Sequence, residues 1–190
     1  MRGFSKVMQF SGRDTGSQFW PYAAIVILLV FIATGGLMSV MTNAIFQDMA
    51  AFAAEHPEAA TVQSSPGHYS IQVDASHPEA PAPDFGLFLK GFPALALIAV
   101  LFLAVAVSRR LHDRNLRAYW GLMPVPFLAF SMIGFPRMMS EMMTGGDPNM
   151  TMFFALFFNN VIYVALLAVL IVLLVGASTV GPNRFGSLDS

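Results

Sequence analysis

The amino-acid sequence predicts an all-α membrane protein: a four-transmembrane-helix bundle with a short amphipathic N-terminal helix and a small extracytoplasmic β-hairpin or loop. Three observations predict this fold. Hydrophobic residues make up 56% of the 190 positions and charged residues only 11%, against roughly 25% in soluble domains. Four apolar runs divide the chain, each near the roughly 20 residues that a helix needs to cross the hydrocarbon core. The polar segments between these runs differ sharply in positive charge.

The first elements are an N-terminal segment, residues 1–19, and a span at residues 21–41. The segment mixes apolar and basic side chains, which predicts a short amphipathic helix on the inner leaflet. Trp20 and Tyr22 mark the start of the span, since such rings favour the membrane–water interface. The apolar stretch is too long for the h-region of a cleaved signal peptide, so we expect a retained helix.

Residues 50–84 form the longest segment outside the predicted spans and contain no lysine or arginine. Residues 60–64 and 68–73 flank a Ser65-Pro66-Gly67 turn signal, which predicts a small β-hairpin. The tetrad His-Pro-Glu-Ala occurs twice, at residues 56–59 and 77–80, on either side of this hairpin. A hairpin would bring the two copies together.

Three further spans complete the predicted membrane domain, at residues 85–107, 118–135 and 152–177, with loops at 108–117 and 136–151 and a tail at 178–190. Pro124 and Pro126 predict a kink in the third span, with neighbouring helices satisfying the freed backbone groups. Asn159 and Asn160 lie in the fourth span. We expect at least one of them to face another helix, because an amide that points into lipid is costly.

The distribution of positive charge predicts that both termini are cytoplasmic. With four spans, eight of the ten lysines and arginines fall on the side of the N-terminus, and only Lys90 and Arg137 fall on the other side. The positive-inside rule then predicts a multi-pass membrane protein with its basic face in the cytoplasm. The net charge of −1 gives no indication of nucleic-acid binding, and the absence of cysteine excludes disulfides and thiolate chemistry.

Three polar motifs lie at predicted membrane boundaries on the cytoplasmic side. Their sequences are Phe10-Ser11-Gly12-Arg13 ahead of Phe19-Trp20, Arg109-Arg110-Leu111-His112-Asp113-Arg114 ahead of Tyr119-Trp120, and Gly181-Pro182-Asn183-Arg184-Phe185-Gly186. In these three motifs and their order, the chain resembles the bacterial membrane proteins catalogued as domain of unknown function 805. The resemblance spans residues 10–186 and implies a small inner-membrane protein without an assigned activity. Gly16 and Gln18 stand where that family often has Arg and Glu.

These motifs define a candidate polar cluster with two interpretations. In the first interpretation, its cations keep the loops on the cytoplasmic side of the membrane and contact lipid phosphates. In the second interpretation, they form a specific anion or lipid-headgroup site with bidentate guanidinium contacts. We expect Asp113 to pair with an arginine or cap a turn rather than to work with His112 in acid–base catalysis, since adjacent helical residues point about 100° apart. The cluster contains Arg13, Arg109, Arg110, His112, Asp113, Asn183 and Arg184.

No metal site, cofactor or catalytic constellation is predicted. His56, His68 and His77 are spaced by twelve and nine residues in a Pro/Ala-rich loop, which is not a zinc signature, so we expect solvated side chains. We also expect the methionines to be apolar filler. The sequence contains no phosphate-binding loop, zinc helix or nucleophile elbow. We therefore expect a non-enzymatic membrane component. Its expected partners are anionic lipids, another membrane protein or further copies of the same chain in a homo-oligomer. The alternative is a small transporter or channel lined by Asn159 and Asn160.

Overall fold

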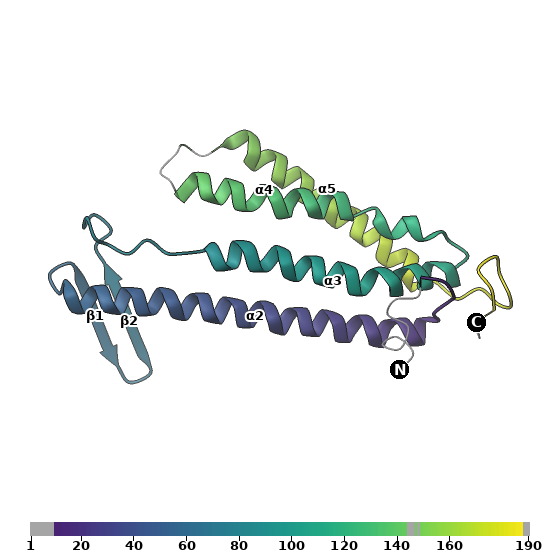
Figure 1. Cartoon of the computed structure of the whole chain (residues 1–190), viewed down its shortest axis with the longest axis horizontal. Coiled ribbons are helices and arrows are strands. Elements are labelled where there is room, and N and C mark those ends of the chain that lie inside the picture. Colours follow the sequence, from purple (N-terminus) through teal and green to yellow (C-terminus); the bar gives the residue numbers. More distant parts are fainter. Residues whose placement is uncertain (1–9, 144–146, 148, 188–190) are drawn as a thin grey trace. The chain divides into compact units, whose positions relative to one another are not determined.

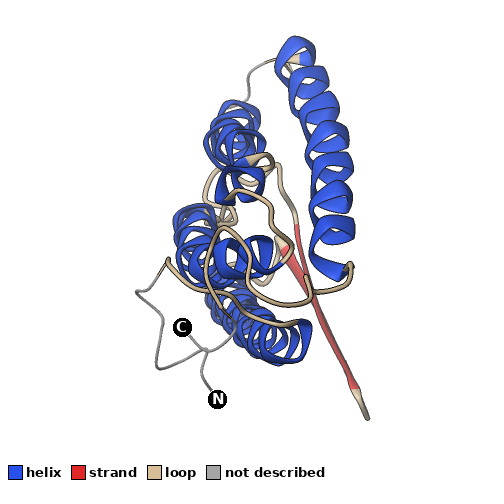
Figure 2. Cartoon of the chain, turned by 90° about the vertical axis from the view of Figure 1, so that its right-hand side faces the viewer, coloured by secondary structure: helices blue, strands red, loops and turns tan. Residues whose placement is uncertain are grey.

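The computed structural model describes residues 10–143, 147 and 149–187. Within these residues the regular secondary structure consists of helices and one pair of strands, joined by loops (Figures 1 and 2). The long helices are α2 (Gly16–Glu55), α3 (Gly86–Asp113), α4 (Val125–Met143) and α5 (Met150–Val175). The strands β1 (Ala60–Ser65) and β2 (His68–Val73) separate α2 from α3. A short 3₁₀-helix, η1 (Ala118–Leu122), precedes α4. The predicted helical class and the hairpin are therefore confirmed.

Four stretches of the described chain are long and apolar enough to cross a membrane: Gly16–Glu55, Gly86–Asp113, Ala118–Met143 and Met150–Val175. Their apolar side chains face largely outward. Phe31, Ile133 and Val172 are 77%, 74% and 70% exposed. Exposed apolar surface on this scale would be unfavourable in water, so a lipid bilayer is the solvent that fits these helices.

The chain divides into two compact units, one drawn from residues 1–30 and 96–190 and the other from Phe31–Leu95. In the first unit, the start of α2, the second half of α3 and the end of α5 share a core that is closed to solvent. The Tyr22 hydroxyl donates to the Phe102 carbonyl oxygen at 3.0 Å and ties α2 to α3. The buried members of this core are Phe19, Tyr22, Ala23, Val26, Ala106, Leu111, Leu170 and Leu174.

The structure describes only the last part of the predicted N-terminal segment. Residues 1–9, where most of the amphipathic helix is expected, lie outside the described residues, and residues 10–15 are not helical. At the start of helix α2 the Gln18 side chain accepts the Thr15 backbone N–H at 3.1 Å, which is one half of a capping box, and the Gln18 N–H donates to the Thr15 carbonyl. The helix then continues beyond the predicted end at Met41, as far as Glu55.

The two prolines of the predicted third span lie where η1 gives way to α4 rather than inside one kinked helix. Pro124 sits in the turn between the two elements, and Pro126 is the second residue of α4. Proline is tolerated in the first turn of a helix because the missing N–H has no intrahelical partner there. The prolines therefore set where α4 begins.

The second unit contains the hairpin. Strands β1 and β2 pair antiparallel from Ala60↔Val73 to Ser65↔His68. Pro66 and Gly67 form the connecting turn, and Gly67 has a φ of +80°, which glycine adopts without strain in a type II turn. In the same unit α3 lies close to α2, since a Cβ at Gly91 would come within 2.9 Å of Leu37.

Candidate functional site

Three segments that are far apart in the sequence meet in the first unit to form a buried arginine–aspartate cluster. The residues before α2 supply Arg13 and Asp14, the end of α3 supplies Arg109, Arg110 and Asp113, and the segment after α5 supplies backbone carbonyls. Figure 1 shows the purple segment that leads into α2 and the yellow segment after α5 beside the end of α3. The five charged side chains are all at least nine-tenths buried.

Arg13 uses every N–H of its guanidinium within this cluster. Nε and Nη2 donate to Asp113 Oδ1 at 3.3 and 3.1 Å. Nη2 also donates to the Thr179 carbonyl at 2.7 Å, and Nη1 donates to the carbonyls of Gly181 and Gly186 at 2.6 and 3.2 Å. Five donors are all that a guanidinium has, so Arg13 has none left for an external anion.

Arg110 binds the other oxygen of the same carboxylate. Its Nη1 donates to Asp113 Oδ2 at 2.5 Å and to the Ser178 hydroxyl at 3.0 Å. Asp113 is thus fully buried between two arginines, and the prediction that it pairs with an arginine is confirmed. Arg109 forms a separate pair, in which Nε donates to Asp14 Oδ2 at 2.7 Å.

Arg110 of α3 and Arg114, which directly follows this helix, also cap the C-terminal end of α5. The last carbonyls of a helix have no intrahelical partner, and the last turn of α5 holds no basic residue of its own. Arg114 donates to the carbonyls of Val172 and Leu173 at 3.3 and 2.5 Å, and Arg110 donates to that of Leu174 at 2.9 Å. Positive charge at this end also complements the helix dipole.

Gly176 leaves room for this cap. Arg110 Nη2 donates to its carbonyl at 2.7 Å. A Cβ at this position would overlap the Arg114 guanidinium. The close approach of Arg114 to the end of α5 therefore requires a residue without a side chain.

The C-terminal motif folds back against the end of α3. Asn183 Nδ2 donates to the His112 carbonyl at 2.8 Å, and the His112 ring stacks on Phe185 with centroids 4.0 Å apart. Arg184 lies over the same Phe185 ring at 4.8 Å and donates to the Asn115 carbonyl at 2.7 Å. In contrast to the buried arginines, the Arg184 side chain is exposed.

The structure therefore brings together all seven residues of the predicted polar cluster. Neither predicted asparagine belongs to it. Asn159 donates across to α4, to the Phe127 carbonyl and the Ser131 hydroxyl, both at 2.8 Å. Asn160 is exposed and donates to the Leu156 carbonyl of its own helix at 2.9 Å. The expectation that one amide faces another helix is thus confirmed by Asn159.

Sequence reasoning missed Asp14, the partner of Arg109, and the carbonyl acceptors at Thr179, Gly181 and Gly186. Asp14 directly follows Arg13, and this adjacency was a signal that could have found it. The carbonyl acceptors carried no such signal, because every residue has a carbonyl. Only the path of the backbone after α5 decides which of them face Arg13.

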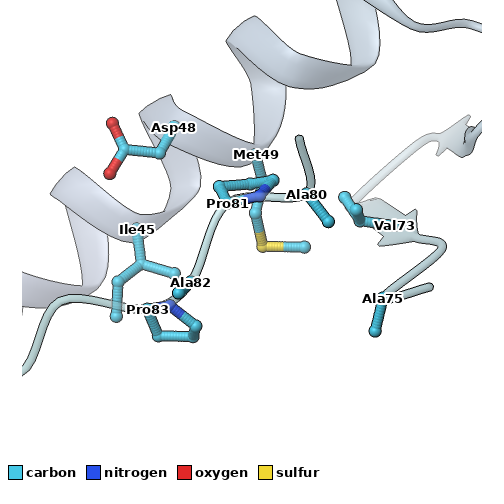
Figure 3. Close-up of a pocket in the computed structure, with 9 residues that line it drawn as sticks. All are labelled: Ile45, Asp48, Met49, Val73, Ala75, Ala80, Pro81, Ala82 and Pro83. Carbon is cyan, nitrogen blue, oxygen red and sulfur yellow. The ribbon is translucent and has the colours of Figure 1, made fainter. Parts of the chain in front are cut away.

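The second unit holds two further features. His56 and His77 contact each other, with ring centroids 4.7 Å apart. The hairpin thus brings the two tetrads together as expected, but the two histidines are not the solvated side chains that were predicted. Beside them, a cavity of 420 Å³ lies between α2, the end of β2 and residues 80–83. Figure 3 shows Ile45, Asp48 and Met49 of α2 at this cavity, opposite Pro81 and Pro83. Among the described residues Asp48 is the one charged group of the lining, so this part of the chain does not supply the several converging polar groups that orient a ligand.

Comparison with known proteins identifies a family and no individual relative. The family model for "Protein of unknown function (DUF805)" matches residues 7–187, nearly the whole chain. No curated protein and no solved structure matches the chain. The matched region contains all three polar motifs and the four candidate membrane-spanning helices. The chain therefore belongs to the DUF805 family of membrane proteins, whose function is unknown.

Proposed function

We propose that this protein is a non-enzymatic component of the bacterial inner membrane, and that it binds anionic phospholipid headgroups through exposed arginines on its cytoplasmic face. The arginines that we assign to headgroups are Arg117 and Arg184, which are both exposed. The buried arginines have a structural task instead, as they join the three segments and cap α5.

One observation carries the proposal: the hydrogen-bond donors of the buried arginines are directed inward. Arg13 spends all five N–H groups on Asp113 and backbone carbonyls. The Arg117 side chain has no hydrogen-bond or ion-pair partner among the described residues. A guanidinium fork matches the geometry of a phosphate. Arg117 can direct all its donors to that contact, and Arg184 can use those that do not bond Asn115.

The surroundings of Arg117 fit a membrane boundary. Tyr119 and Trp120 follow it and are 53% and 37% exposed. Aromatic side chains of this kind concentrate at the headgroup level of bilayers. The positive-inside rule supports a cytoplasmic location for this boundary, since eight of the ten lysines and arginines share its side of the predicted spans.

The alternative of a small transporter or channel has less support. Asn159 and Asn160 were its predicted polar lining. The Asn159 amide donates twice to α4, which supports helix packing rather than a polar path. Asn160 donates to a carbonyl of its own helix.

The experiment uses Trp120 as a reporter of nearby lipid. The chain has two tryptophans, so a Trp20→Phe background leaves Trp120 alone, three residues from Arg117. The protein is reconstituted in vesicles, and quenching of Trp120 by brominated phosphatidylglycerol is compared with quenching by brominated phosphatidylcholine. We expect the unsubstituted protein to prefer the anionic lipid. Arg117→Ala and Arg184→Ala should each lower this preference about fivefold, because one cation near the surface contributes about 1 kcal/mol to binding.

Arg137→Ala is the matched control. Arg137 is a 74% exposed arginine of α4 on the opposite side of the predicted span, so the same charge is removed far from Trp120. We expect this variant to keep the full lipid preference. Equal preference in the unsubstituted protein and in a variant that combines Arg117→Ala with Arg184→Ala would contradict the proposal, as would an equal loss in Arg137→Ala.

A further inference from the structure

The two His-Pro-Glu-Ala copies fold into the same turn. The Ala59 N–H donates to the His56 carbonyl at 3.0 Å, and the Ala80 N–H donates to the His77 carbonyl at the same distance. Proline suits the second position of such a turn because its φ is already fixed. Each copy therefore presents one histidine and one glutamate on an equivalent backbone.

The hairpin register places the two copies opposite each other. Ala60 pairs with Val73, and the Asp74 N–H extends the ladder to the Ala59 carbonyl at 2.8 Å. His56 lies four residues before Ala60, and His77 lies four residues after Val73, so the register places the two histidines opposite each other, with their rings tilted by 47°. Phe52 of α2 supports both rings, with its centroid 4.9 Å from that of His56 and 5.3 Å from that of His77.

The side chains that converge there are of the kinds that commonly coordinate zinc, namely histidine and glutamate. One ring nitrogen of each histidine and one carboxylate oxygen of Glu58 all lie within 4.8 Å of one another. Zinc takes imidazole nitrogen and carboxylate oxygen at about 2.0–2.2 Å, which puts neighbouring ligands of a tetrahedral site about 3.4 Å apart. His56 Nδ1 and Glu58 Oε1 are 3.4 Å apart.

Glu79, the glutamate of the second copy, contacts the other nitrogen of His56. Its Oε2 lies 2.9 Å from His56 Nε2. Metal-binding histidines usually donate their second ring N–H to a carboxylate or carbonyl, which fixes the ring and raises the basicity of the coordinating nitrogen. Glu79 is placed for that role, with His56 Nδ1 left to face the ion.

We infer that the paired His-Pro-Glu-Ala turns form a zinc-binding site in which His56, Glu58 and His77 are the ligands and Glu79 is a positioning residue. A water molecule completes the four-coordinate shell. The His56 side chain is 23% exposed, whereas the carboxylates of Glu58 and Glu79 are 68% and 70% exposed. The ion can therefore enter from solvent, and the glutamates can close on it by small rotations.

The test measures zinc binding to the full chain in detergent, with any histidine tag removed. Protein stripped with EDTA is titrated with Zn²⁺ by calorimetry, and bound zinc is counted by mass spectrometry after desalting. We expect one zinc ion per chain, and His56→Gln or His77→Gln to weaken binding at least tenfold. His68→Gln is the matched control, because His68 is an exposed histidine of the same hairpin outside the ligand group, and it should bind like the unsubstituted protein.

Glu58→Gln keeps the test decisive if a histidine variant fails to fold. Glu58 is largely exposed, so its replacement leaves the hairpin intact and removes one ligand, and it should also weaken binding at least tenfold. No zinc bound by the unsubstituted protein would overturn the inference. So would equal binding by the unsubstituted, His56→Gln, His77→Gln and Glu58→Gln proteins, or an equal loss in His68→Gln.

Discussion

At the scale of single residues, Asp113 supplies the negative charge that two buried arginines share. Its carboxylate is completely buried and accepts from Arg13 on one oxygen and from Arg110 on the other. A buried ion pair gains little over a well-packed apolar alternative, but removing one partner leaves an uncompensated charge in a medium of low dielectric. The burial of the two arginines therefore depends on the Asp113 carboxylate that lies between them.

Asp113→Asn should lower the free energy of unfolding by about 3–5 kcal/mol, because two buried guanidiniums lose their shared counter-charge. Denaturant unfolding in detergent micelles measures this change. Glu141→Gln is the control, since Glu141 is half-exposed and lies 3.5 Å from an exposed arginine, where an ion pair contributes less than about 1 kcal/mol. Similar losses in the two variants would contradict the assignment of Asp113 as the centre of the cluster.

At the scale of secondary-structure elements, the Asn159 amide joins helix α5 to helix α4. Asn159 reaches the Phe127 carbonyl and the Ser131 hydroxyl of α4. The helices also approach closely at Gly134, where a Cβ would lie 2.8 Å from Leu156. Small residues and interhelical hydrogen bonds are the main means of helix association where lipid removes the hydrophobic driving force.

Asn159→Ala should destabilise the pairing of α4 and α5 by about 0.5–1.5 kcal/mol, the usual size of such bonds in membrane proteins. Asn160→Ala is a control on the next residue, because its amide bonds only within α5 and its loss should have a smaller effect. Unfolding by SDS, followed by circular dichroism, compares the two variants. An Asn160 effect as large as that of Asn159 would show that a contact outside this helix pair stabilises the protein.

The arginine–aspartate cluster sets the topology at the scale of the whole molecule. Arg13 precedes the first candidate span, Asp113 ends the second, and Gly181 follows the fourth, yet the three are hydrogen-bonded partners. Segments that touch lie on the same side of a membrane, so an even number of crossings separates each pair. Four spans meet this condition.

A pair of cysteine variants tests which side that is. The chain has no cysteine, so Ser11→Cys and Ser64→Cys each introduce a single thiol at an exposed position. One predicted span separates the two positions. We expect a membrane-impermeant maleimide to label Ser64→Cys in intact spheroplasts and Ser11→Cys only after the membrane is opened. The reverse pattern would place the basic face outside and contradict the proposed orientation.

The sequence by itself determined the class of this protein. Length and apolar content predicted four membrane-spanning helices, the Pro66-Gly67 turn predicted the hairpin, and the three polar motifs predicted the family. These features are local, because a helix, a turn or a motif depends on residues that are neighbours in the chain. The helix ends were predicted less well, since the capping contacts that fix them involve particular side chains.

Only the tertiary structure decided which polar groups face one another. The sequence could not show that the donors of Arg13 are spent on the carbonyls after α5, or that Asp14 pairs with Arg109. The predicted hairpin implied that the two His-Pro-Glu-Ala copies meet, but only the observed register shows that the His56 and His77 rings contact each other. Charge partners and ligand groups are set by distances in space, and those distances follow from how the helices and strands pack.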